Sequence, residues 1–367
     1  MQTLERILKR FLLRLIGVFR SGAHYTVTQL PVRSFNRILI IRQHDQLGDL
    51  LIATPALRAV RRRFPDAFIA VVVREYTAPI VQNNPYIDEV IVFYEKLWRW
   101  NLRKLIFFWK SIRNKFDCAI VLNTISRSLS SDLVALVSGA KFIVGPDHLM
   151  LDASSPEKIY NVLVSRSSSQ MHEIDRNLDI VRILGADEND FEYDLVLTDA
   201  EVNEAEKIYQ SLKIGLGKMV VGVHFGALNP SKCFPLEKLS VIIDWMAEKF
   251  DAEIVLIISP NEIERRKIVM SAVHHRIFTA PVMPLRIMAA FLRHLNLVLC
   301  NDTGTLHLAA SQRVPTVSFH SLSDPAIWKP PHSRHIAVRA DDSLITSITV
   351  GEVQAAVVTA LKKYVRN

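Results

Sequence analysis

The chain has 367 residues, of which 49% are hydrophobic and 22% charged, a composition typical of globular proteins and unlike that of disordered or fibrous ones. Its length exceeds what a single hydrophobic core usually serves, so we expect two domains. The formal net charge of +8 predicts a surface that attracts nucleotides, phosphorylated glycans, anionic lipids or nucleic acids, without choosing among them.

The first twenty residues place apolar side chains at helical spacing and basic side chains mostly on the remaining arc. Basic residues interrupt the hydrophobic run and no small-residue cleavage site follows, so we do not expect a signal peptide. The first twenty residues therefore suit a helix lying in an anionic membrane interface, as part of a basic amphipathic N-terminal segment over residues 1–33. A helix packed on its own domain or on another subunit is an equally good interpretation.

From residue 34 onward, short β-branched runs alternate with longer amphipathic stretches, which predicts α/β domains with parallel sheets covered by helices. We expect a first domain over residues 34–212, a linker near 212–218 where two glycines occur, a second domain over 218–345, and a C-terminal helix over 346–367. The predicted strands are 37–42, 67–73, 89–93, 118–122, 142–144, 219–224, 253–258, 295–300 and 316–319. The predicted helices are 50–63, 172–184, 199–212, 236–250, 261–273, 284–295 and 305–311.

Gly48 and Asp49 follow the first predicted strand through a loop that contains His44 and Asp45. This loop lies at the carboxyl edge of the sheet, where ligands bind in open α/β folds. Asp49 is therefore a candidate functional carboxylate. Taken alone, the motif is better explained by an acidic residue that stabilises the start of a helix.

The segment 301–307 follows an apolar strand and opens a helix, so its backbone N–H groups suit a phosphate. Its candidate ligand-binding residues are Asp302, Thr303, Gly304, Thr305 and His307. Neither a Gly-x-Gly-x-x-Gly fingerprint nor a Walker motif is present, which disfavours nicotinamide and P-loop chemistry. An ordinary N-capped helix is the alternative interpretation.

His224 and Gly226 follow another strand, and Lys232 comes shortly after them. A lysine ammonium beside a helix N-terminus can stabilise a departing diphosphate without a metal ion. Taken singly, an exposed loop lysine is the better explanation. The case for chemistry rests on the segments together.

In order and context these segments resemble glycosyltransferase family 9, the ADP-heptose:lipopolysaccharide heptosyltransferases. Residues 37–66, with Leu-Gly-Asp, Thr-Pro-Ala-Leu and Phe-Pro-Asp, match the family's opening block, and 224–235 are similar to its His-x-Gly-Ala…Lys-x-Trp-Pro segment. Residues 301–310 and 323–328 are similar to its Asn-Asp-Thr-Gly…His-Leu-Ala-Ala and Thr-Asp-Pro…Trp blocks. Four blocks in the right order outweigh the alternative interpretation of any one of them.

The resemblance implies the GT-B fold, with two Rossmann-like domains whose parallel sheets face a central cleft, the acceptor on the first and the nucleotide sugar on the second. It implies an inverting transferase without metal or cofactor, in which Asp49 is the base and Lys232 stabilises the leaving diphosphate. The implied donor-binding residues are His224, Gly226, Glu262 or Glu264 for the ribose, Asp302, Thr303, Gly304, Thr305 and His307. The implied acceptor-side loop contains His44, Asp45 and Gly48.

Two departures from the family pattern leave the sugar and the acceptor open. Cys233 and Phe234 stand where the family usually has a basic residue and Trp, and residues 43–46 replace small hydroxyl residues. The family's donor is ADP-heptose, and its acceptors are lipopolysaccharide-core or related cell-envelope glycans.

We expect the protein at the inner face of the cytoplasmic membrane. A segment that begins at Lys96 and ends at Lys115 interleaves basic residues with tryptophan and phenylalanine, which suits a lipid headgroup zone. For about half of these aromatics, burial in the core is the alternative.

Three other functions are weaker interpretations of the same sequence. A sugar-nucleotide epimerase or hydrolase on the same fold would turn over donor without an acceptor. A nucleotide-binding or membrane-docking module without catalysis is disfavoured by the presence of Asp49, Lys232 and His307. Nucleic-acid binding is disfavoured because the basic residues cluster in amphipathic helices and no recognised motif occurs.

Overall fold

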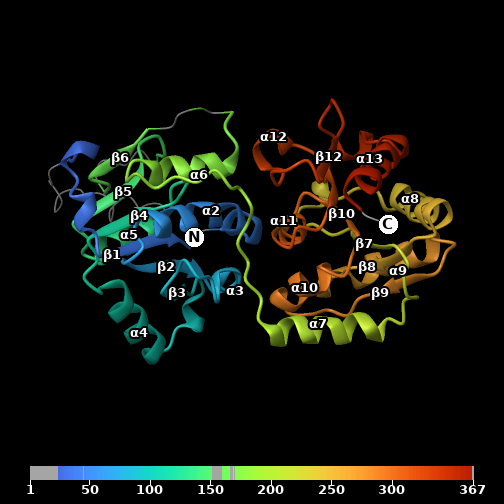
Figure 1. The fold of residues 1–367 in the computed structure, drawn as a ribbon, viewed down its shortest axis with the longest axis horizontal. Coiled ribbons are helices and arrows are strands. Elements are labelled where there is room, and N and C mark those ends of the chain that lie inside the picture. Colours follow the sequence, from blue (N-terminus) through green and yellow to red (C-terminus); the bar gives the residue numbers. More distant parts are fainter. Residues whose placement is uncertain (1–23, 44, 151–158, 166–167, 169, 366–367) are drawn as a thin grey trace. The chain divides into compact units, whose positions relative to one another are not determined.

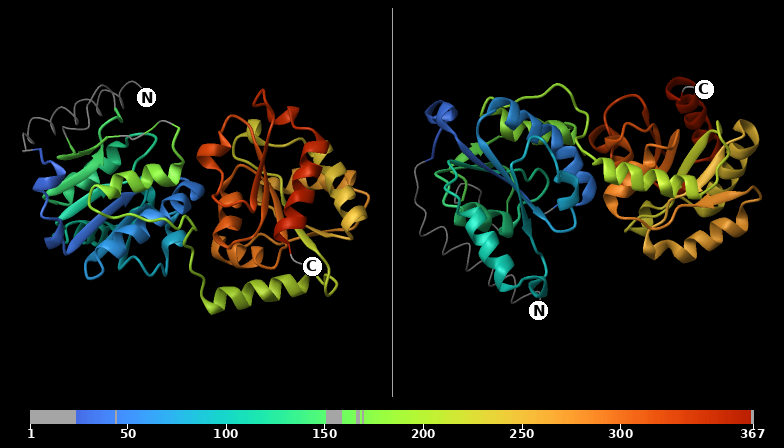
Figure 2. Two further views of the ribbon diagram at one scale, coloured as in Figure 1. Left: turned by 45° about the horizontal axis from the view of Figure 1, so that its top comes forward. Right: turned by 60° about the horizontal axis from the view of Figure 1, so that its bottom comes forward.

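The computed structural model describes residues 24–43, 45–150, 159–165, 168 and 170–365, so the predicted N-terminal helix and His44 lie outside the described residues. The chain divides into two compact units, Met1–Asp194 and Leu195–Asn367. Each unit holds a six-stranded parallel sheet with helices on both of its faces (Figures 1 and 2). The predicted pair of Rossmann-like α/β domains is confirmed.

The first unit has the strand order β3-β2-β1-β4-β5-β6. Its strands are β1 (Arg37–Arg42), β2 (Phe68–Arg74), β3 (Glu89–Phe93), β4 (Cys118–Val121), β5 (Phe142–Pro146) and β6 (Val162–Val164). Its helices are α2 (Leu47–Arg63), α3 (Ala78–Val81), α4 (Leu102–Ile112), α5 (Leu129–Val137) and α6 (Glu173–Arg182), with short 3-10 turns η1 (Val27–Gln29), η2 (Val32–Ser34) and η3 (Leu97–Arg99).

Strand β1 lies at the centre of this sheet, and residues 38–41 are fully buried, as expected for a parallel strand covered on both faces. Leu39 and Ile41 share a core cluster with Phe108 of α4 and Val134 of α5. Because side chains alternate along a strand, Ile38 and Ile40 face the opposite layer, where α2 packs against α6.

The second unit repeats the arrangement with the strand order β12-β11-β10-β7-β8-β9. Its strands are β7 (Val220–His224), β8 (Glu253–Leu256), β9 (Ile277–Thr279), β10 (Leu297–Asn301), β11 (Thr316–His320) and β12 (His335–Arg339). Its helices are α7 (Asp199–Ser211), α8 (Leu236–Phe250), α9 (Ile263–Ala272), α10 (Leu285–Leu292), α11 (Gly304–Ser311), α12 (Pro325–Trp328) and α13 (Val350–Tyr364), with 3-10 turns η5 (Pro230–Lys232), η6 (Pro260–Glu262) and η7 (Ile345–Ser347).

The boundary between the units differs from the sequence-based boundary at residues 212–218. Helix α7, which we assigned to the first domain, packs against α10 of the second unit. Arg286 of α10 fixes the start of this segment, since its guanidinium donates to Glu201 at 2.5 and 2.9 Å and to the Val196 carbonyl at 2.5 Å. The glycines that suggested a linker form a turn, in which Gly217 has a φ of +73°.

The two terminal segments also differ from their predicted limits. Helix α13 contributes Val353, Val357 and Leu361 to the core of the second unit, so it is part of that unit. At the other end, the chain packs on the first unit well before residue 34, because the Tyr25 N–H donates to the Asn161 carbonyl at 2.8 Å and Leu30 is buried. Within the described part of the chain, we find no helix with the length and apolarity that crossing a bilayer requires.

Candidate active site

The predicted site residues gather where the strand order of each sheet reverses. In the first sheet this point lies between β1 and β4, and in the second between β7 and β10. Ligands of open α/β folds bind beside the carboxyl ends of the strands at such a point. Asp45 and Asp49 follow β1, the segment 224–226 ends β7, and the segment 302–305 follows β10.

Asp49 lies in the first turn of α2 and not in a loop, because the helix begins at Leu47, three residues earlier than expected. Gln46 is the N-cap residue, and its backbone N–H donates to Asp49 Oδ2 at 3.0 Å. Asp49 therefore has the helix-stabilising role that was the alternative interpretation. Its side chain is only partly buried, so this role leaves the carboxylate accessible. Gly48 belongs to the same turn and is buried.

Asp45 has a different environment, although it is close by. It is buried and forms an ion pair with the buried Arg42, whose Nη1 also donates to Asn177 Oδ1 at 2.8 Å. Burial raises the pKa of Asp45 to about 7 against the opposing effect of Arg42, and the charge of Asp49 raises it further. Arg74 Nη1 donates to the Asp45 carbonyl at 3.0 Å, which anchors the loop at the end of β1.

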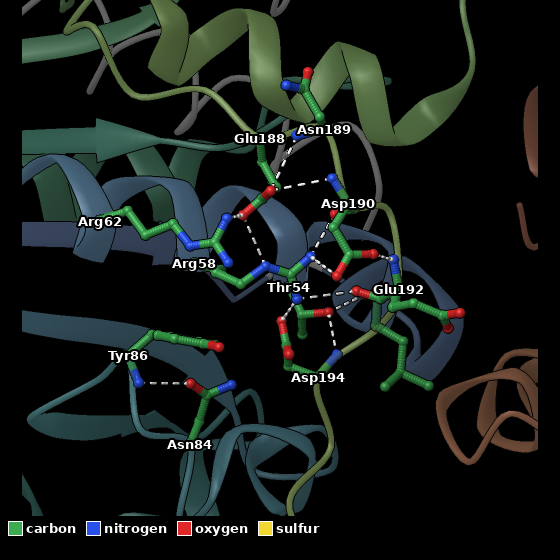
Figure 3. A network of polar contacts seen from close by, with 11 residues as sticks. Thr54, Arg58, Arg62, Asn84, Tyr86, Glu188, Asn189, Asp190, Glu192 and Asp194 are labelled. Atoms are coloured by element: carbon green, nitrogen blue, oxygen red, sulfur yellow. Dashed lines mark hydrogen bonds and ion pairs between the residues drawn. The ribbon is translucent and has the colours of Figure 1, made fainter.

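The Thr-Pro pair of the opening block, Thr54 and Pro55, lies in the middle of α2. Figure 3 shows the contacts of Thr54. Pro55 has no N–H to donate to the carbonyl four residues before it, which is that of Leu51. The Thr54 hydroxyl donates to this carbonyl instead, at 2.7 Å, and accepts the Asp194 N–H at 2.9 Å. The Thr54 hydroxyl therefore replaces the hydrogen bond that Pro55 cannot donate. It also binds the backbone of Asp194 at the end of the first unit.

Arg58, one turn further along α2, holds the same segment. Its guanidinium lies 2.9 Å from Glu188 and 2.6 Å from Asp194, and Arg62 lies 2.6 Å from Glu188 (Figure 3). Sequence reasoning missed this network, because Arg58 and its partners are 130 or more residues apart. The one available signal was a proline preceded by threonine within a helical pattern.

In the second unit, Lys232 and Asp302 meet at the end of β10. Lys232 Nζ lies 3.0 Å from Asp302 Oδ2, which also accepts a hydrogen bond from Ser323 Oγ at 2.5 Å. Burial opposes ionisation of Asp302, but His320, Ser323 and Lys232 together hold its pKa below the ordinary value. Lys232, Asp302 and Ser323 come from three of the four sequence blocks that resemble the family, and they meet at one ionised carboxylate.

Asn301 connects the loop after β7 to the loop after β10. It is fully buried, its Oδ1 accepts the Phe234 N–H at 3.0 Å, and its Nδ2 donates to the Gly226 carbonyl at 3.2 Å. Phe234, which stands where Trp is usual, stacks on Phe319 with ring centroids 4.3 Å apart. Phe234 is thus part of the hydrophobic core of the second unit, and its backbone N–H binds Asn301 of the site.

Glu262 lies against the backbone of Gly226. A Cβ atom at residue 226 would lie 1.2 Å from Glu262 Oε1, so only glycine leaves room for this carboxylate. His224 Nε2 is 3.7 Å from the same oxygen, and burial lowers the pKa of His224. Glu264, the other candidate, is largely exposed and pairs with Lys267 at 2.8 Å. The geometry therefore groups Glu262, and not Glu264, with His224 and Gly226.

The start of α11 remains open to a ligand. Thr303 is the N-cap residue but makes no side-chain capping bond, because its hydroxyl donates to the Asn301 carbonyl at 3.3 Å. Thr303 and Gly304 are partly exposed, whereas Thr305 and His307 are buried. Free N–H groups at a helix start beside the Lys232 ammonium suit a diphosphate.

The comparison with protein families decides the class of the molecule. The family model described as glycosyltransferase family 9 (heptosyltransferase) matches residues 105–349. The chain belongs to this family. It is a glycosyltransferase with the GT-B fold, as the sequence motifs predicted.

Individual relatives agree with the family. The chain is 23% identical over 309 residues to lipopolysaccharide heptosyltransferase 3 of Escherichia coli, covering 80% of this chain and 86% of that protein. The family 9 glycosyltransferase of Veillonella parvula superposes with a TM-score of 0.75 at 21% identity, covering 90% of this chain and 97% of the other. Escherichia coli heptosyltransferase WaaC, solved with ADP, has a TM-score of 0.70 at 20% identity, with coverages of 88% and 99%.

Proposed function

We propose that this glycosyltransferase transfers heptose from ADP-heptose to a lipid-linked glycan of the lipopolysaccharide-core type, with inversion at the anomeric carbon. The observation that carries the proposal is the convergence of Lys232, Asp302 and the open start of α11 at the switch point of the second sheet. The relative solved with ADP supports an adenine nucleotide as donor.

In the proposed reaction the second unit holds the donor. Glu262 accepts hydrogen bonds from the ribose hydroxyls, and the glycine at 226 leaves room for this carboxylate. Lys232 and the N–H groups of residues 303–305 bind the diphosphate and stabilise the charge that develops as it leaves. Asp302 keeps Lys232 in place through their 3.0 Å ion pair. His307, buried in the first turns of α11, supports this surface.

Asp49 of the first unit removes the proton from the acceptor hydroxyl. A carboxylate is a sufficient base if the glycosidic bond breaks early, because the attacking hydroxyl then becomes acidic late in the reaction. Asp45 and Gly48, close to Asp49 in the chain, belong to the acceptor side in this proposal. A lipid-linked acceptor implies that the enzyme acts at the inner face of the cytoplasmic membrane.

The test is a transfer assay with ADP-heptose and a lipid-linked core acceptor, followed by determination of the anomeric configuration of the product. We expect donor consumption only when acceptor is present, and a product whose configuration is opposite to that of the donor. Consumption of ADP-heptose without acceptor would instead support the epimerase or hydrolase interpretation. Retention of configuration would rule out the single-step role of Asp49.

A further inference from the structure

Helix α4 has two adjoining apolar faces, and only one of them is covered. On the inner face, Phe108 and Ile112 are buried in the core cluster that includes Ile91 of β3, beside which α4 lies (Figure 1). The outer face carries four large apolar side chains at i, i+3, i+4 and i+7. They are Leu102, Leu105, Ile106 and Trp109, which are 72%, 51%, 45% and 50% exposed.

The turn before α4 extends this exposed surface. Trp98 of η3 is 76% exposed, and Lys96 Nζ lies 5.0 Å from the centre of its ring. Arg113 lies 5.3 Å from the ring of Trp109 in the same manner. Trp100, by contrast, packs edge-on against Phe108 and donates its N–H to the Tyr94 carbonyl at 2.7 Å. Trp100 and Phe108 are therefore core residues, whereas Trp98 and Trp109 are at least half exposed.

The charge of the segment is entirely of one sign. Residues 96–115 contain no Asp or Glu, and their basic residues are Lys96, Arg99, Arg103, Lys104, Lys110, Arg113 and Lys115. Seven of the 45 basic residues of the chain thus lie in twenty positions. Such a surface attracts a strongly anionic partner.

An anionic bilayer fits this combination better than a second copy of the chain. A symmetric dimer places the same surface of both copies together, which would oppose seven cations with seven more. A bilayer interface offers anionic headgroups for the cations and hydrocarbon for the apolar stripe, and tryptophan prefers the boundary between them. Helices with one apolar and one basic surface lie in that plane.

We propose that residues 96–113, comprising η3 and α4, form a membrane-docking element that lies in the interface of an anionic phospholipid bilayer. Leu102, Leu105, Ile106 and Trp109 face the acyl chains, and the basic residues contact the headgroups. The inference goes beyond the transfer reaction proposed above and does not depend on it, because it involves neither donor nor acceptor.

The first experiment measures sedimentation of the full chain with vesicles of phosphatidylglycerol and phosphatidylcholine. We expect Leu105→Ser/Trp109→Ser to weaken binding at least tenfold. The control Leu216→Ser/Val241→Ser removes two apolar side chains of the second unit that are 103% and 54% exposed, and should bind as the parent does. Because all four side chains are at least half exposed, the thermal unfolding midpoints should stay close to that of the parent.

A second pair of variants separates local charge from net charge. Arg103→Glu/Lys110→Glu and Lys362→Glu/Lys363→Glu change the net charge equally, but only the first pair lies on α4. We expect the α4 pair to lose most of the vesicle binding and the α13 pair to retain it. Equal losses would indicate a nonspecific charge effect and would overturn the proposal.

Insertion itself is measured by quenching of tryptophan fluorescence with brominated lipid. Of the five tryptophans, Trp98 and Trp109 should be quenched, so that Trp98→Phe/Trp109→Phe still binds vesicles but shows little quenching. If the α4 variants bind as the parent does, the attachment lies elsewhere, with residues 1–23 the first candidate, and the proposal fails. The proposal also fails if the parent protein forms dimers through α4 and does not bind vesicles.

Discussion

The two carboxylates after β1 show how local environment separates chemical roles. Asp45 is buried against Arg42, and its pKa is raised to about 7. Asp49 caps its own helix with one oxygen and remains partly exposed. Asp45 would be the stronger base, but its carboxylate neutralises the buried arginine. Accessibility therefore favours Asp49 as the group that meets a substrate.

Replacing Asp49 with Asn should lower turnover by about 100- to 10,000-fold, because it removes the general base while keeping the shape and much of the capping capacity. Donor affinity and the free energy of unfolding should change little. Single-turnover transfer and calorimetric donor binding measure the two effects. Asp45→Asn is the informative control, because it changes a neighbouring carboxyl that pairs with the buried Arg42 and should lower turnover far less than Asp49→Asn does. Transfer at the parental rate by Asp49→Asn would place the base elsewhere.

Lys232→Ala should weaken donor binding and lower the transfer rate, with the larger effect on the rate, because negative charge develops on the leaving diphosphate. The same assays measure both quantities. Lys267, which pairs with Glu264 on the surface of α9, provides a matched control, and Lys267→Ala should behave as the parent does. A loss of binding with an unchanged rate of the bound complex would assign Lys232 to ground-state binding alone.

At the scale of single elements, what could be predicted from the sequence depended on burial. The central strands were predicted closely because continuous apolar runs distinguish them. Strands β6, β9 and β12 were missed because they are short or only partly buried; β6, for example, has the exposed Leu163 between two buried valines. The start of α2 was placed too late because Gly48 is a poor helix former, whereas the Gln46–Asp49 capping contact starts the helix before it.

The two hydrogen bonds of the Thr54 hydroxyl next to Pro55 should contribute to the free energy of unfolding. Thr54→Val keeps the shape of the side chain but leaves the Leu51 carbonyl and the Asp194 N–H without the hydroxyl between them. Unsatisfied buried polar groups cost about 1–3 kcal/mol each, so urea unfolding should show a loss of about 2–6 kcal/mol. Thr54→Ser retains the hydroxyl and should lose much less. A larger loss in Thr54→Ser than in Thr54→Val would mean that the methyl group, and not the hydrogen bonds, matters.

At the scale of the whole molecule, the unit boundary was the feature least accessible to sequence reasoning. The chain leaves the first unit at Asp194 and enters the second at Leu195, in a stretch without Gly or Pro. Arg58 and Thr54 hold residues up to 194 on the first unit, and Arg286 holds Val196 on the second. Those partners are 90 to 140 residues away in the chain, and the amino-acid composition of the stretch does not indicate such contacts. Composition does not indicate the hydrogen bond between Ser323 and Asp302 either.

The transferase should work without a divalent metal ion. Lys232 with the start of α11 already offers positive potential to the diphosphate, which is what a divalent ion would supply. Transfer should therefore continue at the parental rate in excess EDTA. Activity that is lost in EDTA and restored by magnesium or manganese would contradict the leaving-group role of Lys232.

The last prediction concerns where the chain can be shortened at its N-terminus. Residues 24–33 contribute to the first unit, because the ring of Tyr25 packs edge-on against Phe142 with centroids 5.0 Å apart, and Leu30 is buried. Removing two such contacts costs about 2–5 kcal/mol, and each kcal/mol shifts the unfolding midpoint by about 2–4 °C in a domain of this size. A chain lacking residues 1–33 should therefore unfold at least about 4 °C below one lacking only residues 1–23, as measured by scanning calorimetry. Tyr25→Ala/Leu30→Ala in the longer chain should reproduce most of the difference. Identical midpoints for the two truncations would show that residues 24–33 do not stabilise the fold. Either truncation could then be used to test whether the N-terminal segment binds vesicles.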